Sequence, residues 1–279
     1  MLSVDILKED PNEYKKYMTI QEQFEREGNF NTDINENSYD GTLPVTEDFE
    51  FIKKGIKNAF KHAIYSTAMR IYTNKICKLL KVEIKGKENL KGVKSAIITC
   101  NHISKFDSFA IRKAVGINIM FVAADYNNWA GKMGETARYT GYLPLSNKYS
   151  VMKKFNQAVE YYLNKGKKIL IYPEQAMWRD YEKPRPMKDG AFHYAVKHNV
   201  PILPLFITFR NSGIVENGVE LKYYTVNILK PIYKQAKLTD KENIEYMRKT
   251  NYTCWKECYE STYQKALTYT TLDKSKIKI

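Results

Sequence analysis

Cysteine is scarce in this sequence, with four among 279 residues. Four cysteines are too few for the disulfide framework of a small secreted domain. Cys254 and Cys258 would lie one helical turn apart, but neither a second pair nor a nearby histidine completes a zinc site. We therefore expect four reduced thiols, as in a cytoplasmic protein, and no bound metal.

Long apolar runs are missing as well. No apolar stretch reaches the roughly 20 residues that a membrane-spanning helix needs. Near the start, Asp5, Lys8, Glu9 and Asp10 interrupt the apolar region that a signal peptide would require. If the protein acts at a membrane, we expect it to lie on the surface.

Acidic residues are sparse after the first fifty positions. Residues 1–50 contain 13 acidic and 4 basic side chains, whereas residues 51–279 contain 41 basic and 18 acidic side chains. This excess of positive charge favours an anionic partner, such as a phospholipid surface, a phosphorylated substrate or nucleic acid, over a merely solvated surface. Nucleic acid is the least favoured of the three, because no recognition motif is present and the basic residues are dispersed.

The chain divides into four segments. Residues 1–47 form an acidic, loosely ordered arm, and residues 48–80 form one or two amphipathic helices. Residues 81–235 form the core, and residues 236–279 form a helical C-terminal segment. In the second segment Ile52, Ile56, Phe60, Ile64 and Ala68 recur every four residues beside a stripe of lysines. Such a helix lies on a membrane surface or packs on the core with its lysines in water.

Strand and helix signals alternate from residue 82 onward. Strands are expected at 82–85, 95–100, 117–123, 142–145, 168–172, 202–209 and 222–228. Helices are expected at 106–115, 128–140, 150–164, 190–198 and 240–267. The alternation predicts an α/β fold, with a largely parallel mixed sheet flanked by helices. Ligands of such sheets bind beyond the carboxyl ends of the strands.

His102 and Asp107 follow the expected strand at 95–100. At this spacing the two side chains can meet across one turn, and a carboxylate on one imidazole nitrogen leaves the other nitrogen available as a base. The alternative is that both residues only cap the helix after them. Glu174 directly follows another strand, so its carboxylate can point into the same crevice as His102.

Asn101, His102 and Asp107 resemble the His-x-x-x-x-Asp block of the glycerolipid acyltransferases, the 1-acylglycerol-3-phosphate acyltransferase-like family. Residues 141–145, 172–174 and 200–204 are similar to three further blocks of that family, in the same order. Residues 85–90 also resemble the segment that precedes the first block in that family. Together these features cover roughly residues 82–210. Four blocks in order are far more specific than one.

The resemblance implies transfer of a fatty acyl group from a thioester to a lysophospholipid hydroxyl in phospholipid biosynthesis. His102 is then the general base and Asp107 orients it. No cofactor is implied, because acyl-CoA or acyl carrier protein is the donor substrate, and the protein works peripherally on the cytoplasmic face of an anionic membrane. Ser104 lacks a Gly-x-Ser-x-Gly turn, so we read it as a polar group near the base rather than a nucleophile.

The resemblance also assigns residues to the substrates. Glu174 inherits a role in acceptor binding, and Asn101 belongs to the same site. Backbone N–H groups near Gly141 or Glu174 are candidate donors to the oxyanion of the tetrahedral intermediate.

The phosphate-binding part of the pattern is altered. Gln175, Ala176 and Met177 replace the Gly-Thr-Arg of the third block. Arg179 is the first candidate to compensate, because guanidinium binds phosphate in a bidentate manner. Other cations that could do so are Lys148, Arg185 and Lys188, of which Arg185 is expected in a loop at the mouth of the site. Alternatively the acceptor has another head group, for example that of an amino-acid lipid.

A reading of another class remains open, namely a non-catalytic basic protein that binds an anionic membrane or nucleic acid.

Overall fold

The computed structural model describes residues 10–34, 41–271, 273, 275 and 277. The α-helices are α1 (Pro11–Glu27), α2 (Ile56–Leu79), α3 (Asp107–Val115), α4 (Gly131–Tyr139), α5 (Tyr149–Asn164), α6 (Gly190–Lys197) and α7 (Asp240–Tyr263). The strands are β1 (Glu83–Lys85), β2 (Ala96–Thr99), β3 (Ile119–Ala123), β4 (Tyr142–Pro144), β5 (Lys168–Ile171), β6 (Ile202–Glu216) and β7 (Val219–Ile228). Two short 3-10 helices, η2 (Lys87–Leu90) and η3 (Asp125–Asn127), lie in the connections.

The strands form one seven-stranded sheet in the order β1-β7-β6-β2-β5-β3-β4. Every neighbouring pair is parallel except β6 and β7, which are antiparallel. The predicted α/β fold with a largely parallel mixed sheet is confirmed. Because β2, β5, β3 and β4 run the same way, their carboxyl ends share one edge of the sheet.

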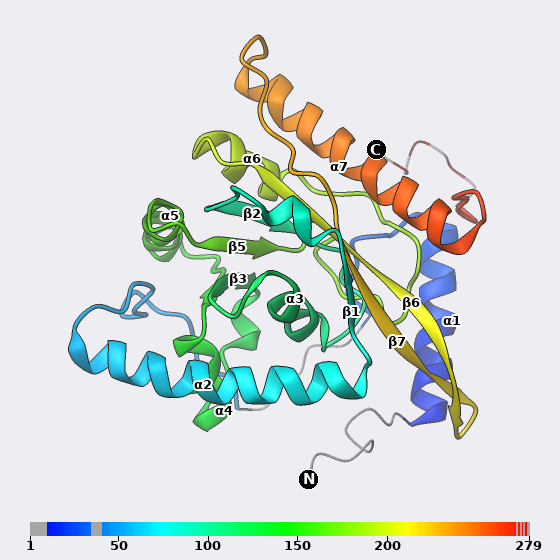
Figure 1. Cartoon of the computed structure of the whole chain (residues 1–279), viewed down its shortest axis with the longest axis horizontal. Helices are drawn as coiled ribbons and strands as arrows, with labels where there is room; N and C mark the ends of the chain where they lie inside the picture. Colours follow the sequence, from blue (N-terminus) through cyan, green and yellow to red (C-terminus); the bar gives the residue numbers. More distant parts are fainter. Residues whose placement is uncertain (1–9, 35–40, 272, 274, 276, 278–279) are drawn as a thin grey trace.

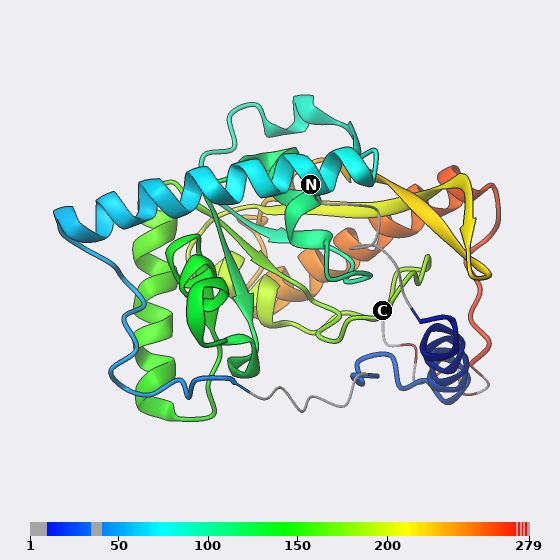
Figure 2. The same ribbon diagram turned by 90° about the horizontal axis from the view of Figure 1, so that it is seen from below.

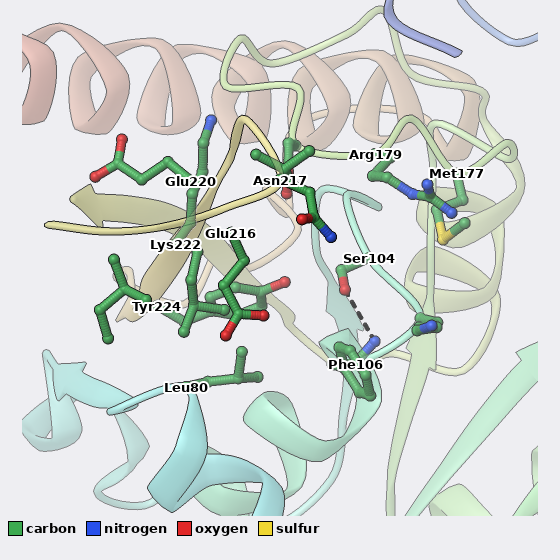
Figure 3. A pocket seen from close by; sticks show the side chains of 15 residues that line it. Leu80, Ser104, Phe106, Met177, Arg179, Glu216, Asn217, Glu220, Lys222 and Tyr224 are labelled. Carbon is green, nitrogen blue, oxygen red and sulfur yellow. Dashed lines mark hydrogen bonds between the residues drawn. The ribbon is translucent and has the colours of Figure 1, made fainter. Parts of the chain in front are cut away.

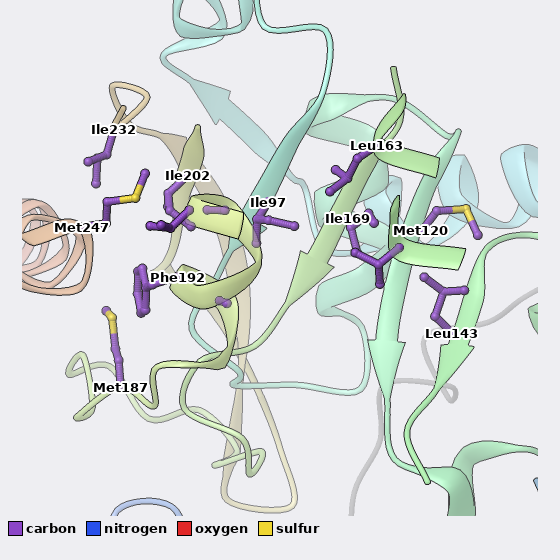
Figure 4. Close-up of a cluster of buried hydrophobic side chains, with 14 of the residues drawn as sticks. Ile97, Met120, Leu143, Leu163, Ile169, Met187, Phe192, Ile202, Ile232 and Met247 are labelled. Carbon is purple, nitrogen blue, oxygen red and sulfur yellow. The ribbon is translucent and has the colours of Figure 1, made fainter. Parts of the chain in front are cut away.

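Helices cover both faces of the sheet (Figure 1). Alternate residues of β2 show why: Ile97 belongs to the cluster under α5, α6 and α7, whereas Ile98 belongs to the cluster under α2 and α3. Figure 4 shows part of the first cluster, to which Ile97, Ile169 and Phe192 belong. Strands that bury both faces read as continuous apolar runs, which is what the sequence contains at these positions.

Strands β6 and β7 extend beyond the apolar segments that predicted them. They continue to a tight turn at Asn217 and Gly218, both of which have a positive φ. Asn-Gly is the pair that such a two-residue hairpin turn favours. The resulting ribbon projects past the rest of the sheet on the side of α1 (Figures 1 and 2).

The helix expected within residues 48–80 begins only at Ile56. Before it, Phe49 and Phe51 turn inward, and the ring of Phe51 lies 6.1 Å from that of Phe155 in α5. Ile52 is partly buried against the same core, so its place on the predicted helical stripe was wrong. Anchoring of the two aromatic side chains outweighs the local helical pattern.

Helix α2 is apolar on two opposite sides. Its C-terminal half packs on α3 through Ile76 and Cys77. The predicted stripe faces outward instead, with exposed fractions of 89% for Ile56, 68% for Phe60 and 51% for Ile64. These three side chains share one face because they are four residues apart. The helix therefore carries an apolar surface that the described part of the chain leaves uncovered.

The N-terminal arm is more ordered than expected. Of this segment, residues 1–9 and 35–40 lie outside the described part, but α1 and the residues after it pack firmly. Tyr17, Gln21, Glu25 and Phe30 are all buried. The ring of Phe30 stacks on Trp178 at a centroid distance of 6.0 Å. The prediction of a loose arm was wrong for these residues because their partners lie about 150 positions away in the sequence.

Candidate active site

The His102–Asp107 turn lies at the carboxyl end of β2. His102 Nδ1 is 2.9 Å from Asp107 Oδ2. The same carboxylate oxygen accepts the backbone N–H groups of Ile103 at 2.8 Å and Ser104 at 3.0 Å. Asp107 is fully buried and opens α3, so it both closes the turn and fixes the imidazole. With Nδ1 directed at Asp107, Nε2 is the nitrogen left for a substrate.

Contacts on other sides also hold His102. Its ring stacks on that of Tyr172, with centroids 3.9 Å apart and planes inclined by 9°. The backbone N–H of His102 donates to Glu174 Oε2 at 3.1 Å, and its backbone carbonyl accepts from the backbone N–H of Trp178 at 2.9 Å. About a quarter of the side chain remains exposed (23%). The imidazole is therefore preorganised and still reachable.

Asn101 has a structural role in this arrangement. Its side-chain amide donates to the carbonyl of Ile207 at 2.9 Å, and its oxygen accepts the N–H of the same residue at 2.8 Å. The side chain is fully buried and joins the end of β2 to β6. Because both ends of the amide are engaged, the expectation that Asn101 contacts substrate was wrong.

Glu174 is likewise turned inward. Its carboxylate accepts the N–H of Arg185 at 2.8 Å and the guanidinium Nη2 of Arg185 at 2.8 Å, besides the N–H of His102. Both side chains of the Glu174–Arg185 pair are at most 1% exposed. The structure therefore replaces the expected acceptor contact by a buried ion pair that links this loop to the backbone of His102.

Arg185 was expected in a loop at the site mouth, and it is one of the largest fully buried side chains instead. Its guanidinium also donates to the carbonyls of His102 at 3.2 Å, Ala176 at 2.6 Å and Phe30 at 2.8 Å. The sequence contains no local signal for these contacts, because three separate segments, at residues 30, 102 and 174–176, meet on this one side chain.

Gly141 and Lys148 do not reach the turn. Gly141 precedes β4, so it lies at the amino end of a parallel strand, opposite to the edge where His102 lies. A Cβ there would come within 2.3 Å of the carbonyl oxygen of Ile119, so glycine serves close strand packing and not oxyanion binding. Lys148 follows β4, three strand spacings or about 14 Å from β2 in the sheet, and its side chain is exposed.

Ser104 and Arg179 line one pocket beside the turn (Figure 3). Ser104 Oγ accepts the N–H of Phe106 at 3.1 Å, and the residue is only 8% exposed. The Arg179 guanidinium lies over the ring of Tyr17 at 5.1 Å, and Met177 lies on the same wall of the pocket. Of the cations proposed from the sequence, Arg179 alone is both near the turn and on a pocket wall.

Gln175 occupies the position where the resembled family has glycine, and it has a left-handed backbone with φ of 66°. This conformation costs a residue with a side chain about 1–2 kcal/mol. Replacing it by glycine removes that cost but adds about 0.5–1 kcal/mol, because glycine loses more backbone entropy on folding. We expect Gln175→Gly to raise the free energy of unfolding by roughly 0.5 kcal/mol or more, as measured by urea denaturation. Asn217→Gly is the control, because asparagine tolerates φ of 52° well. An equal gain at both positions contradicts the explanation from strain.

A sequence model of the Acyltransferase family matches residues 81–208. This range contains the His102–Asp107 turn, Tyr172 and the Glu174–Arg185 pair.

Residues 81–208 thus match an acyltransferase domain.

Several proteins named 1-acyl-sn-glycerol-3-phosphate acyltransferase are similar to this chain. The protein from Limnanthes douglasii is 25% identical over 160 residues, which are 57% of this chain and 54% of that protein. The protein from Saccharomyces cerevisiae is 25% identical over 210 residues, 71% of this chain and 67% of that protein. The chain thus spans about half the length of the first of these relatives.

The fold has a counterpart among solved structures. The crystal structure of the 1-acyl-sn-glycerophosphate acyltransferase PlsC from Thermotoga maritima superposes with a TM-score of 0.54 at 17% identity. The match covers 78% of this chain and 87% of the other. At this identity the similarity concerns the fold alone, and it includes segments on both sides of residues 81–208.

Proposed function

We propose that this acyltransferase moves a fatty acyl group from an acyl thioester to the free hydroxyl of a lysophospholipid, either 1-acylglycerol-3-phosphate or a related lysolipid. The observation that carries the proposal is the 2.9 Å contact between His102 Nδ1 and Asp107 Oδ2. A hydroxyl attacks a thioester slowly unless its proton is removed as the new bond forms, and His102 Nε2 is placed for that task.

The steps balance without a further reactant. His102 Nε2 takes the proton as the acceptor oxygen bonds to the thioester carbon, and the carbonyl becomes an oxyanion. Collapse of this intermediate re-forms the carbonyl and breaks the carbon–sulfur bond, and the thiolate takes the proton back from His102. The buried Asp107 carboxylate stabilises the imidazolium that exists between the two transfers.

A covalent acyl-enzyme is not part of this route. Ser104 Oγ is engaged by a backbone N–H. Cys100, the cysteine closest in sequence to His102, is fully buried, and burial raises the pKa of its thiol well above the ordinary value. Direct attack by the acceptor hydroxyl is therefore the route we propose.

The proposal includes a peripheral position on the cytoplasmic face of an anionic membrane, with acyl-CoA or acyl carrier protein as the donor. In the described ranges, no helix is both long and apolar enough to cross a bilayer. Two features favour the surface position, namely the outward apolar face of α2 and the excess of basic residues after position 50. An apolar face beside lysines is typical of helices that bind anionic bilayers.

The apolar face of α2 yields a direct test. Phe60→Ser removes a side chain that is 68% exposed, and full burial of such a side chain is worth about 1.5–3 kcal/mol. We expect binding to vesicles with anionic lipid, measured by co-sedimentation, to weaken about tenfold. Tyr149→Ser is the matched control, because this ring is 88% exposed on α5, across the sheet from α2. Equal losses in both variants are incompatible with docking through α2.

Purified protein offered a panel of lysolipids with acyl-CoA and acyl carrier protein donors tests the reaction. Mass spectrometry of the lipids should reveal a diacyl product that is absent without enzyme. If no pair yields product while the protein binds anionic vesicles, the non-catalytic alternative replaces this proposal.

A further inference from the structure

A small pocket of about 80 Å³ opens beside the His102–Asp107 turn. Its walls come from the loop at residues 104–106, the loop at residues 177–180, and the hairpin of β6 and β7 (Figure 3). The second loop is joined to the turn by two backbone hydrogen bonds, from Trp178 to His102 at 2.9 Å and from Asp180 to Ile103 at 3.0 Å. A group that enters this pocket therefore lies next to the proposed base.

The pocket is lined by equal numbers of positive and negative side chains. The six side chains with a formal charge are Lys105, Arg179, Lys222, Asp180, Glu216 and Glu220. Their formal charges cancel, although residues 51–279 as a whole carry 41 basic and only 18 acidic residues. A site for a phosphate monoester, with up to two negative charges, should be positive overall. The cancelling charges of this pocket therefore match a phosphate monoester poorly.

The two walls differ in net charge by one unit each way, because Asp180 shares the loop wall with two cations and Lys222 shares the hairpin wall with two glutamates. Lys105 and Arg179 belong to the loops that contact the His102 turn, whereas Glu216 and Glu220 belong to the hairpin. Figure 3 draws Arg179 on one side of Ser104 and the two glutamates on the other. Lys222, the third cation, lies 3.9 Å from Glu182, so an acidic residue outside the pocket shares its charge.

The basic wall is held in place by α1. Tyr17 Oη donates to the carbonyl of Met177 at 2.7 Å and accepts the N–H of Arg179 at 3.2 Å. The Gln21 amide donates to the carbonyl of Arg179 at 3.0 Å. Both α1 residues are buried, so the loop is preorganised before a ligand arrives.

We infer that the acceptor is a zwitterionic lysophospholipid, with a phosphodiester facing Lys105 and Arg179 and an ammonium group facing Glu216 and Glu220. The head-group preference in acyl transfer rests on the proposed function, whereas the head-group preference in binding does not. The order of charges follows the order of groups in such a lipid. The hydroxyl lies on the glycerol at His102, the phosphate comes next, and the ammonium group lies farthest from the base, at the hairpin. Complementary placement of both charges provides specificity over lipids that carry phosphate alone.

Lysolipids of one acyl chain and different head groups test the inference by kinetics. We expect kcat/KM for lysophosphatidylcholine or lysophosphatidylethanolamine to exceed that for lysophosphatidate at least tenfold. The double variant Glu216→Gln/Glu220→Gln should lower the zwitterion value about tenfold through KM and leave lysophosphatidate unchanged or better. Glu257→Gln, an exposed site on α7, is the control for loss of an acidic charge and should change neither.

Binding to the His102→Ala protein separates this inference from the reaction. By calorimetry, glycerophosphocholine should bind more tightly than glycerol 3-phosphate, and the double glutamine variant should abolish the difference. Binding as expected without turnover on any acceptor would refute the proposed function and leave the head-group assignment standing. Tighter binding or faster acylation of the phosphate monoester would refute the assignment and leave acyl transfer standing.

Discussion

His102→Ala should lower kcat for acyl transfer by about a thousandfold, in the range of roughly 10²–10⁴ that a general base contributes. The imidazole is held by Asp107 at 2.9 Å and by the ring of Tyr172 at a centroid distance of 3.9 Å. Removing it leaves the substrate pocket in place, since the pocket walls belong to other residues. The expected signature is therefore a fall in kcat with little change in the KM for the acceptor.

His193→Ala is the matched control, because this histidine is exposed on α6. It should retain full activity, and both variants should melt within a few degrees of the parent protein. Transfer that survives His102→Ala would remove the base from the mechanism. A loss confined to KM would instead assign His102 to substrate binding.

Glu174→Gln should lower the free energy of unfolding by about 3–5 kcal/mol, which is the cost of leaving one partner of a buried ion pair uncompensated. The Arg185 guanidinium is 0% exposed, so water cannot replace the lost charge. The same guanidinium holds the carbonyl of His102, so activity should fall together with stability. Urea denaturation measures the first effect and steady-state acylation the second.

Two comparisons make the ion-pair prediction specific. Glu245→Gln removes a pair with Lys249 in which both side chains are more than half exposed, and it should cost much less than Glu174→Gln, because water screens exposed charges. Glu174→Gln combined with Arg185→Met should cost less than the sum of the single variants, because neither charge is then left alone. Strict additivity, or a loss at Glu174 no larger than at Glu245, contradicts the role of the pair.

The Glu174–Arg185 pair changes how the third sequence block contributes to the site. From the sequence, Glu174 is a group that contacts substrate, and Arg185 is a cation at the entrance. In the structure the two neutralise each other beneath the turn and tie residues 30, 102 and 176 together. Arg179 is then the arginine that lines the pocket, with the acidic hairpin opposite.

The order of strands and helices follows from the sequence alone. Apolar runs bounded by turns and helical periodicity are local properties, and they predicted the strands and helices of the core within a few residues, except that β6 continues to residue 216 instead of ending at 209. The His102–Asp107 contact is local in the same sense, since five positions along the chain span one turn. Errors began where a side chain had a distant partner, as for Phe51, whose packing on α5 delays the start of α2 until residue 56.

Only the tertiary structure decided what surrounds the turn. Tyr17, Phe30 and Arg185 approach His102 or its neighbouring loop from positions far apart in the sequence, and no periodicity or spacing announces such contacts. The charge of the pocket has the same origin, because the hairpin brings Glu216 and Glu220 to loops more than thirty positions earlier in the chain. The sequence by itself thus determined the α/β core and the proposed base. Long-range packing decided which side chains support that base and which can face the acceptor, because burial and charge pairing depend on neighbours in space.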